Sequence, residues 1–146
     1  MAAQKAQNFA NHVRFVPLYH VVTLGILALN FLYATYRVIK APSVGTIVAV
    51  LVSIALILLA VFARAFAITV QDRVIRLEMR LRMREVLPAD LYHRALALTP
   101  KQLVALRFAG DAELPPLCAK VLDDDIHDQK VIKKMVKDWQ PDYLRA

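Results

Sequence analysis

The sequence predicts an all-α protein: a two-helix transmembrane hairpin whose second helix extends into the cytoplasm, followed by a small helical C-terminal domain. Three observations support this prediction. The chain of 146 residues is 58% apolar, and the apolar residues are concentrated between positions 15 and 70, as in a membrane protein. Residues 46–87 contain no Gly or Pro, which favours one long helix. Residues 88–146 contain short amphipathic segments separated by Pro.

A polar N-terminal segment, residues 1–14, precedes the first predicted span at 15–39. No residue from Phe15 to Tyr36 carries a fixed charge. Such a segment is about 33 Å long as a helix, against a hydrocarbon core of about 30 Å. The apolar run is too long for a signal peptide and no A-x-A cleavage site follows it. We therefore predict an uncleaved transmembrane helix.

A short external turn, residues 40–43, leads to the second span at 44–66, which must then run antiparallel to the first. The ends opposite the turn carry more basic residues than the turn does: Lys5, Arg14, Arg64 and the arginines after it, against Arg37 and Lys40. Because cytoplasmic ends of transmembrane helices are enriched in Lys and Arg, both termini are predicted to be cytoplasmic.

Two polar residues are expected to meet inside the hairpin. Asn30 and Ser53 are about equally far from the apex, since their numbers sum to 83. A polar pair between membrane helices contributes roughly 0.6–2 kcal/mol. The pair either holds the hairpin together or, in an oligomeric pore or transporter, lines a path.

His20 is a candidate ligand of a haem or chlorin cofactor, because a histidine inside a transmembrane helix can ligate a metal or relay protons. One helix supplies one ligand, so a haem with two histidine ligands requires a second copy or a partner. His20 also lies only one turn inside the cytoplasmic boundary, where water satisfies it. We therefore expect no cofactor, and a redox subunit remains an alternative.

The Arg-rich juxtamembrane helix, residues 67–87, carries two apolar stripes. One continues a heptad-like pattern out of the membrane: Leu56, Ala60, Ala63, Ala67, Val70, Val74, Leu77 and Leu81. The other comprises Ile75, Met79, Met83 and Val86. Two stripes require two partners, for example a second copy or another membrane subunit on one side and the C-terminal segment on the other. We assign Asn30, Ser53, Val70, Val74, Leu77 and Leu81 to helix–helix contacts.

Arginines of the second long helix are predicted to contact anionic lipid headgroups. They are Arg64, Arg73, Arg76, Arg80 and Arg84. The net charge of +7 arises entirely within residues 1–87, beside the apolar spans. Lipid binding and membrane topology explain charge in that place more simply than nucleic-acid binding does, and we expect no nucleic-acid partner.

The cytoplasmic domain, residues 88–146, is predicted to contain four short helices. The expected ranges are 88–97, 100–108, 115–122 and 125–138. Thr99, Pro100 and Gln102 match a capping box with Pro at the first helical position. Asp123, Asp124 and Asp125 are expected at the N-terminus of the last helix, where negative charge is favourable. Four such helices bury too little area to be robust alone, so we expect them to dock on the long helix or on a partner.

No catalytic or metal-binding pattern is found. The chain has no CxxC, no HExxH and only three Gly residues, which are too few for a typical phosphate-binding loop. Asp123–Asp125 and His127 resemble a metal site, but adjacent helical residues point in different directions and no second cluster is evident. The single Cys118 forms no internal disulfide and is typical of a reducing compartment.

Three stretches resemble a small, uncharacterised bacterial family of two-span membrane proteins that are sometimes labelled transporter permeases. They are Gln7-Asn8-Phe9 with Asn11, His12, Arg14 and Pro17, the central segment 98–109, and the closing segment 133–143. The resemblance covers nearly the whole chain and implies no functional residues. Two spans do not enclose a substrate path without oligomerising.

These observations together predict a non-enzymatic integral protein of the bacterial cytoplasmic (inner) membrane. We expect an accessory or scaffolding subunit of a membrane complex, or a self-assembling protein. Its expected partners are anionic lipids and either other membrane subunits or itself.

Overall fold

The computed structural model describes residues 7–9, 11 and 15–142, and it is helical, with no strand in these ranges. The chain divides into two compact units. Residues 14–68 form one, which we call the hairpin unit. Residues 1–13 and 69–146 form the other, which we call the C-terminal unit. The all-α prediction is confirmed.

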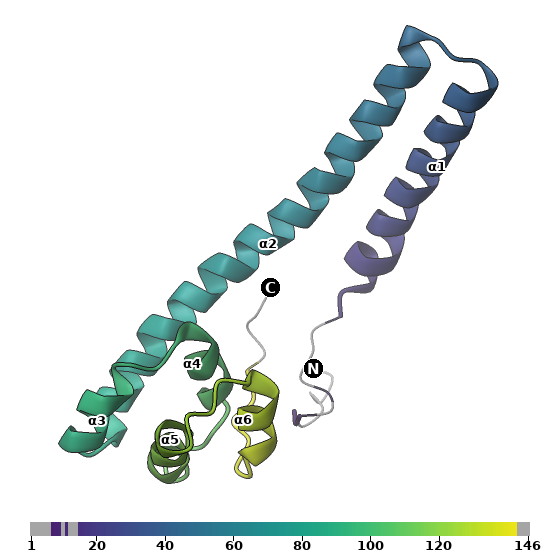
Figure 1. Ribbon diagram of the computed structural model, residues 1–146. Coiled ribbons are helices and arrows are strands. Elements are labelled where there is room, and N and C mark those ends of the chain that lie inside the picture. The colour runs from purple at the N-terminus through teal and green to yellow at the C-terminus, as the bar shows by residue number, and fades with distance from the viewer. Residues whose placement is uncertain (1–6, 10, 12–14, 143–146) are drawn as a thin grey trace. The chain divides into compact units, whose positions relative to one another are not determined.

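The hairpin unit begins with a π-helix, η1 (Leu18–Thr23), that continues directly into α1 (Leu24–Lys40). Pro17 is the N-cap residue, so its missing N–H costs no helical hydrogen bond. The first part of α2 (Val44–Val86) then runs antiparallel to α1 (Figure 1). The helix persists through Lys40, so the predicted turn at 40–43 shortens to residues 41–43.

The start of α2 is held by reciprocal hydrogen bonds across its first turn. Thr46 N–H donates to Ser43 Oγ at 3.2 Å, and Ser43 N–H donates to Thr46 Oγ1 at 2.9 Å. These bonds satisfy backbone donors that a helix N-terminus leaves without partners. The N-terminus of α2 is therefore well defined directly after the short connection at residues 41–43.

The long helix α2 is continuous over 43 residues, Val44–Val86. Its final turn is closed by the bond from Leu87 N–H to the Met83 carbonyl, 2.9 Å. Pro88 follows, and the residue before a proline disfavours helical backbone. The prediction of one uninterrupted helix between the Pro42 turn and Pro88 is confirmed.

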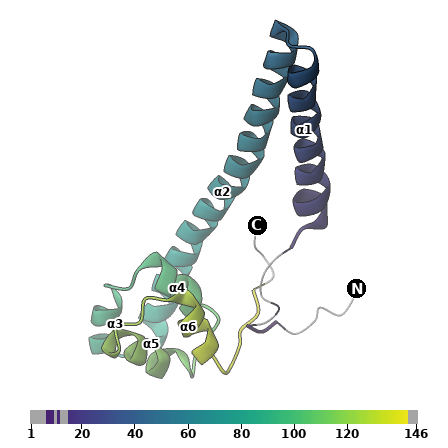
Figure 2. The same ribbon diagram turned by 45° about the vertical axis from the view of Figure 1, so that its right-hand side comes forward.

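The C-terminal unit places four short helices around the last turns of α2 (Figures 1 and 2). They are α3 (Ala89–Ala95), α4 (Pro100–Leu106), α5 (Leu114–Asp123) and α6 (Gln129–Met135). The core is one continuous cluster that includes side chains of α2 and of all four short helices. The largest fully buried side chains of this unit are Met83, Leu103, Leu106, Leu114 and Ile132, which belong to the cluster, and Phe108.

The capping box at the start of α4 is confirmed. Gln102 N–H donates to Thr99 Oγ1 at 3.3 Å, and Thr99 N–H donates to Gln102 Oε1 at 2.8 Å. Gln102 also donates from Nε2 to the Ile126 carbonyl at 2.9 Å and is 4% exposed. Gln102 therefore also joins α4 to the segment between α5 and α6.

The expected position of the three aspartates was wrong. Asp123 and Asp124 end α5, and α6 begins only after Asp128, whose side chain accepts from Lys130 N–H at 2.7 Å. Asp125 has φ 49°, and Ile126 N–H donates back to the Val121 carbonyl at 3.0 Å. This pattern is a Schellman-type helix end. It stops α5, and a helix over 125–138 is replaced by the shorter α6.

Candidate functional site

Asn30 and Ser53, the polar pair of the hairpin unit, are in contact, as their equal distance from the turn predicts. Asn30 donates from Nδ2 to Ser53 Oγ at 2.8 Å, and Ser53 donates to the Ala49 carbonyl at 2.8 Å. Ser53 is 1% exposed, whereas Asn30 is exposed. The serine hydroxyl therefore links α1 to the backbone of α2, and its hydrogen-bonding capacity is used within the hairpin unit.

His20 lies in η1 among aromatic rings. Its imidazole stacks on Phe15 with centroids 4.9 Å apart and meets Tyr19 edge-on at 5.1 Å. Nδ1 is 3.1 Å from Val16 N and 2.9 Å from Val16 O, so the Val16 backbone pairs with either tautomer. Only Nε2 is left to act as an axial ligand, so each chain offers one ligand from this residue.

Tyr19 and Arg64 lie at the end of the hairpin opposite the turn. Tyr19 donates its hydroxyl proton to the Ala60 carbonyl at 2.8 Å, and the Arg64 guanidinium lies 5.5 Å from the Tyr19 ring centroid. An amphipathic ring beside a cation is typical of a membrane–water boundary. Arg64 is the first charged residue of α2 after the turn.

One stripe of α2 is buried in the C-terminal unit. Ile75, Met79 and Met83 are 5%, 3% and 1% exposed, and they belong to the core cluster with Leu91, Leu103 and other residues of the short helices. The unbranched methionines suit an irregular surface made by four short helices. The C-terminal segment thus covers this stripe.

The other stripe of α2 remains exposed. Val70, Val74, Leu77 and Leu81 are 61%, 47%, 65% and 64% exposed, and their spacings of 4, 3 and 4 place them on one face of the helix. We call these four residues the α2 stripe. They are the apolar candidates for helix–helix contact, and no residue of the described chain covers them.

The five arginines assigned to lipid headgroups differ in their surroundings. Arg73, Arg76 and Arg84 are exposed, and Arg64 is half-buried. Arg80 is also half-buried, and its Nη2 donates to the Leu96 carbonyl at 3.5 Å. Arg80 thus lies at the edge of the C-terminal unit rather than in open solvent.

Arg82 has a structural position that the sequence did not reveal. It donates from Nε to Asp111 at 2.7 Å, from Nη1 to the Arg107 carbonyl at 3.2 Å, and from Nη2 to the Ala109 carbonyl at 2.6 Å. The planar fork of a guanidinium suits several acceptors at once. Arg82 therefore fixes the segment after α4 against α2.

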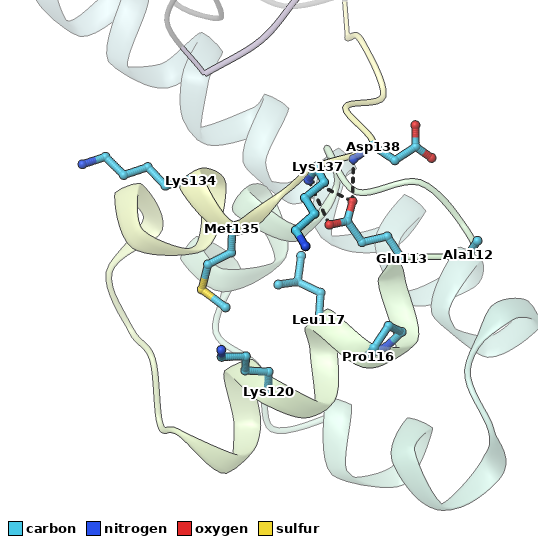
Figure 3. A pocket seen from close by; sticks show the side chains of 9 residues that line it. All are labelled: Ala112, Glu113, Pro116, Leu117, Lys120, Lys134, Met135, Lys137 and Asp138. Atoms are coloured by element: carbon cyan, nitrogen blue, oxygen red, sulfur yellow. Dashed lines mark hydrogen bonds between the residues drawn. The ribbon is translucent and has the colours of Figure 1, made fainter.

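A pocket of about 690 Å³ lies between the first part of α5, with the residues before it, and the end of α6, with the residues after it. It is lined by Ala112, Glu113, Pro116, Leu117, Lys120, Lys134, Met135, Lys137 and Asp138. The Glu113 carboxylate accepts backbone N–H bonds from Lys137 at 2.9 Å and from Asp138 at 2.8 Å (Figure 3). This carboxylate holds the backbone after α6, and Figure 3 shows Lys134 pointing away from the other labelled side chains.

Residues from each of the three stretches that carry the family resemblance meet in the C-terminal unit. Gln7 pairs with the Asp142 backbone, accepting from its N–H at 2.9 Å and donating to its carbonyl at 3.2 Å. Arg107 forms an ion pair with Asp142 at 3.2 Å. Phe108 stacks on Trp139 with centroids 4.5 Å apart. Only the tertiary structure reveals that these distant motifs form one cluster.

Two aspartates of the acidic run near α5 lie against basic side chains. Asp123 pairs with Arg94, and Asp125 lies 3.1 Å from His127. Throughout residues 7–9, 11 and 15–142, no group of three or more His, Cys, Asp or Glu side chains is arranged to hold a metal ion.

Two helices are long and apolar enough to cross a membrane, Leu18–Lys40 and Val44–Val86, and their apolar windows are only 6% buried.

Comparison with known proteins gives one family. No curated protein and no solved structure matches the chain. A family model described as a family of unknown function (DUF6526) matches residues 1–146. The chain therefore belongs to this uncharacterised family.

Proposed function

We propose that the protein is a non-enzymatic, two-span protein of the bacterial cytoplasmic membrane that assembles into a membrane complex through the α2 stripe. The observation that carries the proposal is the exposure of Val70, Val74, Leu77 and Leu81 on a helix whose opposite stripe is buried. An accessory or scaffolding subunit and a self-assembling protein both use such a surface.

The membrane location rests on the two apolar helices. Soluble proteins bury a helix of such composition, whereas the side chains here are largely exposed. Lipid tails cover exposed apolar side chains without cost, and a helix satisfies its own backbone groups within the bilayer. Arg64 and the arginines that follow from Arg73, compared with only Arg37 and Lys40 at the turn, support cytoplasmic termini.

Arg64 is the residue best suited to lipid headgroups. It stacks on Tyr19 at the end of the apolar part of α2. Arg73 follows about 13 Å further along the helix axis. When the helix is perpendicular to the membrane, Arg73 is therefore more than one Debye length further from the headgroups than Arg64 at physiological salt. We therefore propose that attraction to anionic headgroups is strongest at Arg64 and decreases from Arg73 to Arg84.

The α2 stripe requires a protein partner because it lies beyond Arg64. Apolar side chains spaced at 4 and 3 residues form the seam of a helix pair, and contiguous exposed apolar surface marks interaction sites. The C-terminal unit covers the opposite side of α2 through Met79 and Met83. The stripe is thus free to bind without disturbing that core.

The test is purification of tagged protein from native membranes in mild detergent, with complex size, mass spectrometry and an absorption spectrum on one eluate. Val74→Asp with Leu77→Asp should reduce the complex size, whereas the matched control Val131→Asp, an exposed valine on α6, should not. An unchanged complex in the double variant would contradict the proposal. A Soret band that is lost in His20→Ala would instead favour the redox subunit.

A further inference from the structure

We infer that the partner of the α2 stripe is a second copy of this chain, bound as a parallel two-stranded coiled coil over residues 67–85. This inference rests on the proposed function, because it names the occupant of the surface through which the protein assembles. It is carried by the heptad positions of the apolar residues and by the charges that flank them.

The apolar seam has the composition of a two-stranded coiled coil. Ala67, Val74 and Leu81 occupy the a positions, and Val70 and Leu77 occupy the d positions. A β-branched residue at a and Leu at d favour two strands, as in the central heptad of Val74 and Leu77. Arg84 takes the next d position and ends the seam.

The charges beside the seam match a parallel pair. Arg73 and Arg80 lie at g, and Glu78 and Glu85 lie at e. In a parallel coiled coil the g residue of one chain faces the e residue five positions later in the other, and such pairs set partner and orientation. Arg73 then faces Glu78 of the second copy, and Arg80 faces Glu85. Both sides of the seam therefore carry complementary charge pairs at the e and g positions.

The same charges disfavour an antiparallel pair. In that arrangement g faces g and e faces e, so Arg73 and Arg80 would meet arginines while Glu78 and Glu85 would meet glutamates. Like charges across a helix interface are unfavourable. Two copies inserted in one membrane with the same topology also present parallel α2 helices, so membrane insertion and charge select the same orientation.

The intramolecular contacts leave this face available. Ile75, Met83 and Met79 occupy positions b, c and f, opposite the seam, and it is these residues that the C-terminal unit buries. Arg73 and Glu78 are exposed, and neither forms an ion pair within the described part of the chain. Arg80 bonds the Leu96 carbonyl, so the first pair is the cleaner one to test.

Cysteine crosslinking in native membranes tests the register. The native Cys118 is buried and is replaced in a Cys118→Ala background. Val74→Cys and Leu77→Cys should each form disulfide-linked dimers under mild oxidation, because identical seam residues of a parallel pair face each other. Arg76→Cys, exposed at position c, is the matched control and should not crosslink.

Charge reversal tests the partner. Arg73→Glu places Glu opposite Glu78, and Glu78→Arg places Arg opposite Arg73, so each variant alone should self-associate roughly tenfold more weakly than the wild type. When the two are co-expressed with different tags, both contacts become complementary and co-purification should return to the wild-type level. A residue needed only for folding would not give this reciprocal rescue.

The outcomes separate the two proposals. Loss of a different protein from the complex in Val74→Asp with Leu77→Asp, without crosslinks in Val74→Cys or Leu77→Cys, would overturn the second-copy inference and leave the assembly surface standing. No change in complex size and no crosslinks would overturn both. Crosslinks in Val74→Cys and Leu77→Cys with reciprocal rescue of Arg73→Glu by Glu78→Arg would establish the parallel pair.

Discussion

Arg82 shows how much one side chain contributes to the C-terminal unit. Its three donor groups bind the side chain of Asp111 and the carbonyls of Arg107 and Ala109. The Arg82 side chain is 25% exposed and that of Asp111 is 71% exposed, so the carbonyl bonds contribute more than the ion pair does.

We predict that Arg82→Ala lowers the free energy of unfolding of the C-terminal unit by about 2–3 kcal/mol, because two carbonyls lose a charged donor. Asp111→Asn should change it by less than about 0.5 kcal/mol. Urea unfolding in detergent micelles, followed by the fluorescence of the single Trp139, measures both. Arg76→Ala, an exposed arginine on the same helix, is the control, and an equal loss in that variant would contradict the assignment.

Cys118 gives a prediction of pH dependence. Burial raises the pKa of its thiol from 9.0 to about 11, and Arg94 opposes the shift. Below pH 9 the thiol is protonated in both states and contributes no pH dependence. Between pH 9 and 11 the unfolded thiol ionises while the folded one stays protonated, so stability is lost as pH rises.

We therefore expect the unfolding free energy of the wild type to fall relative to that of Cys118→Ala between pH 9 and pH 11. Taking the difference removes the titration of lysines and tyrosines, which both proteins share. The measurement is the urea midpoint at several pH values. A constant difference across this range would show that the folded thiol ionises normally.

At the scale of elements, the chain is organised by the signals that begin and end its short helices and by the two apolar stripes of α2. α4 begins at a capping box, α5 ends in a left-handed residue, and α2 presents one stripe to the core and the other outward. The C-terminal unit therefore covers one apolar stripe of α2 and leaves the other exposed.

We predict that Asp125→Gly stabilises the C-terminal unit by about 0.5 kcal/mol, because Gly adopts φ 49° without the steric cost that an L-residue bears. The exposed pair with His127 contributes little that could be lost. Asp124→Gly is the matched control, since Asp124 has φ −89° and should gain nothing. Thermal unfolding of the two variants decides between them.

At the scale of the whole molecule, the two ends of α2 have different surroundings. Its apolar first part is exposed and, under the proposed function, is covered by lipid, whereas its last turns pack in the core of the C-terminal unit. One continuous helix extends through both parts because no Gly or Pro interrupts α2 after Gly45.

The proposed topology predicts the result of reporter fusions. A reporter that is active only outside the cytoplasm should be inactive when fused at either terminus and active when inserted after Ser43. Arg37→Glu with Lys40→Glu should leave this pattern unchanged, because it removes positive charge only from the external turn. Activity of a fusion at the C-terminus would contradict the orientation.

The C-terminal unit marks the limit of prediction from sequence. The capping box was predictable because Thr99 and Gln102 interact within one turn. The aspartates were misplaced because negative charge favours a helix start, whereas the bond from Ile126 N–H back to the Val121 carbonyl and the left-handed backbone of Asp125 end α5 at this point. The role of Arg82 was not predictable because its acceptors lie 25 to 29 residues away in the chain.

Local patterns were sufficient to predict the all-α architecture, the continuity of α2 and the pairing of Asn30 with Ser53. Apolar periodicity indicates the helices, the lack of chain breakers indicates the continuous α2, and the short turn sets which residues of the hairpin face each other. Which stripe of α2 is buried and which is open depends on the tertiary structure. Both stripes are apolar and helical in period, so only the packing of α3 to α6 on Met79 and Met83 distinguishes them. That packing leaves Val70, Val74, Leu77 and Leu81 as the exposed surface.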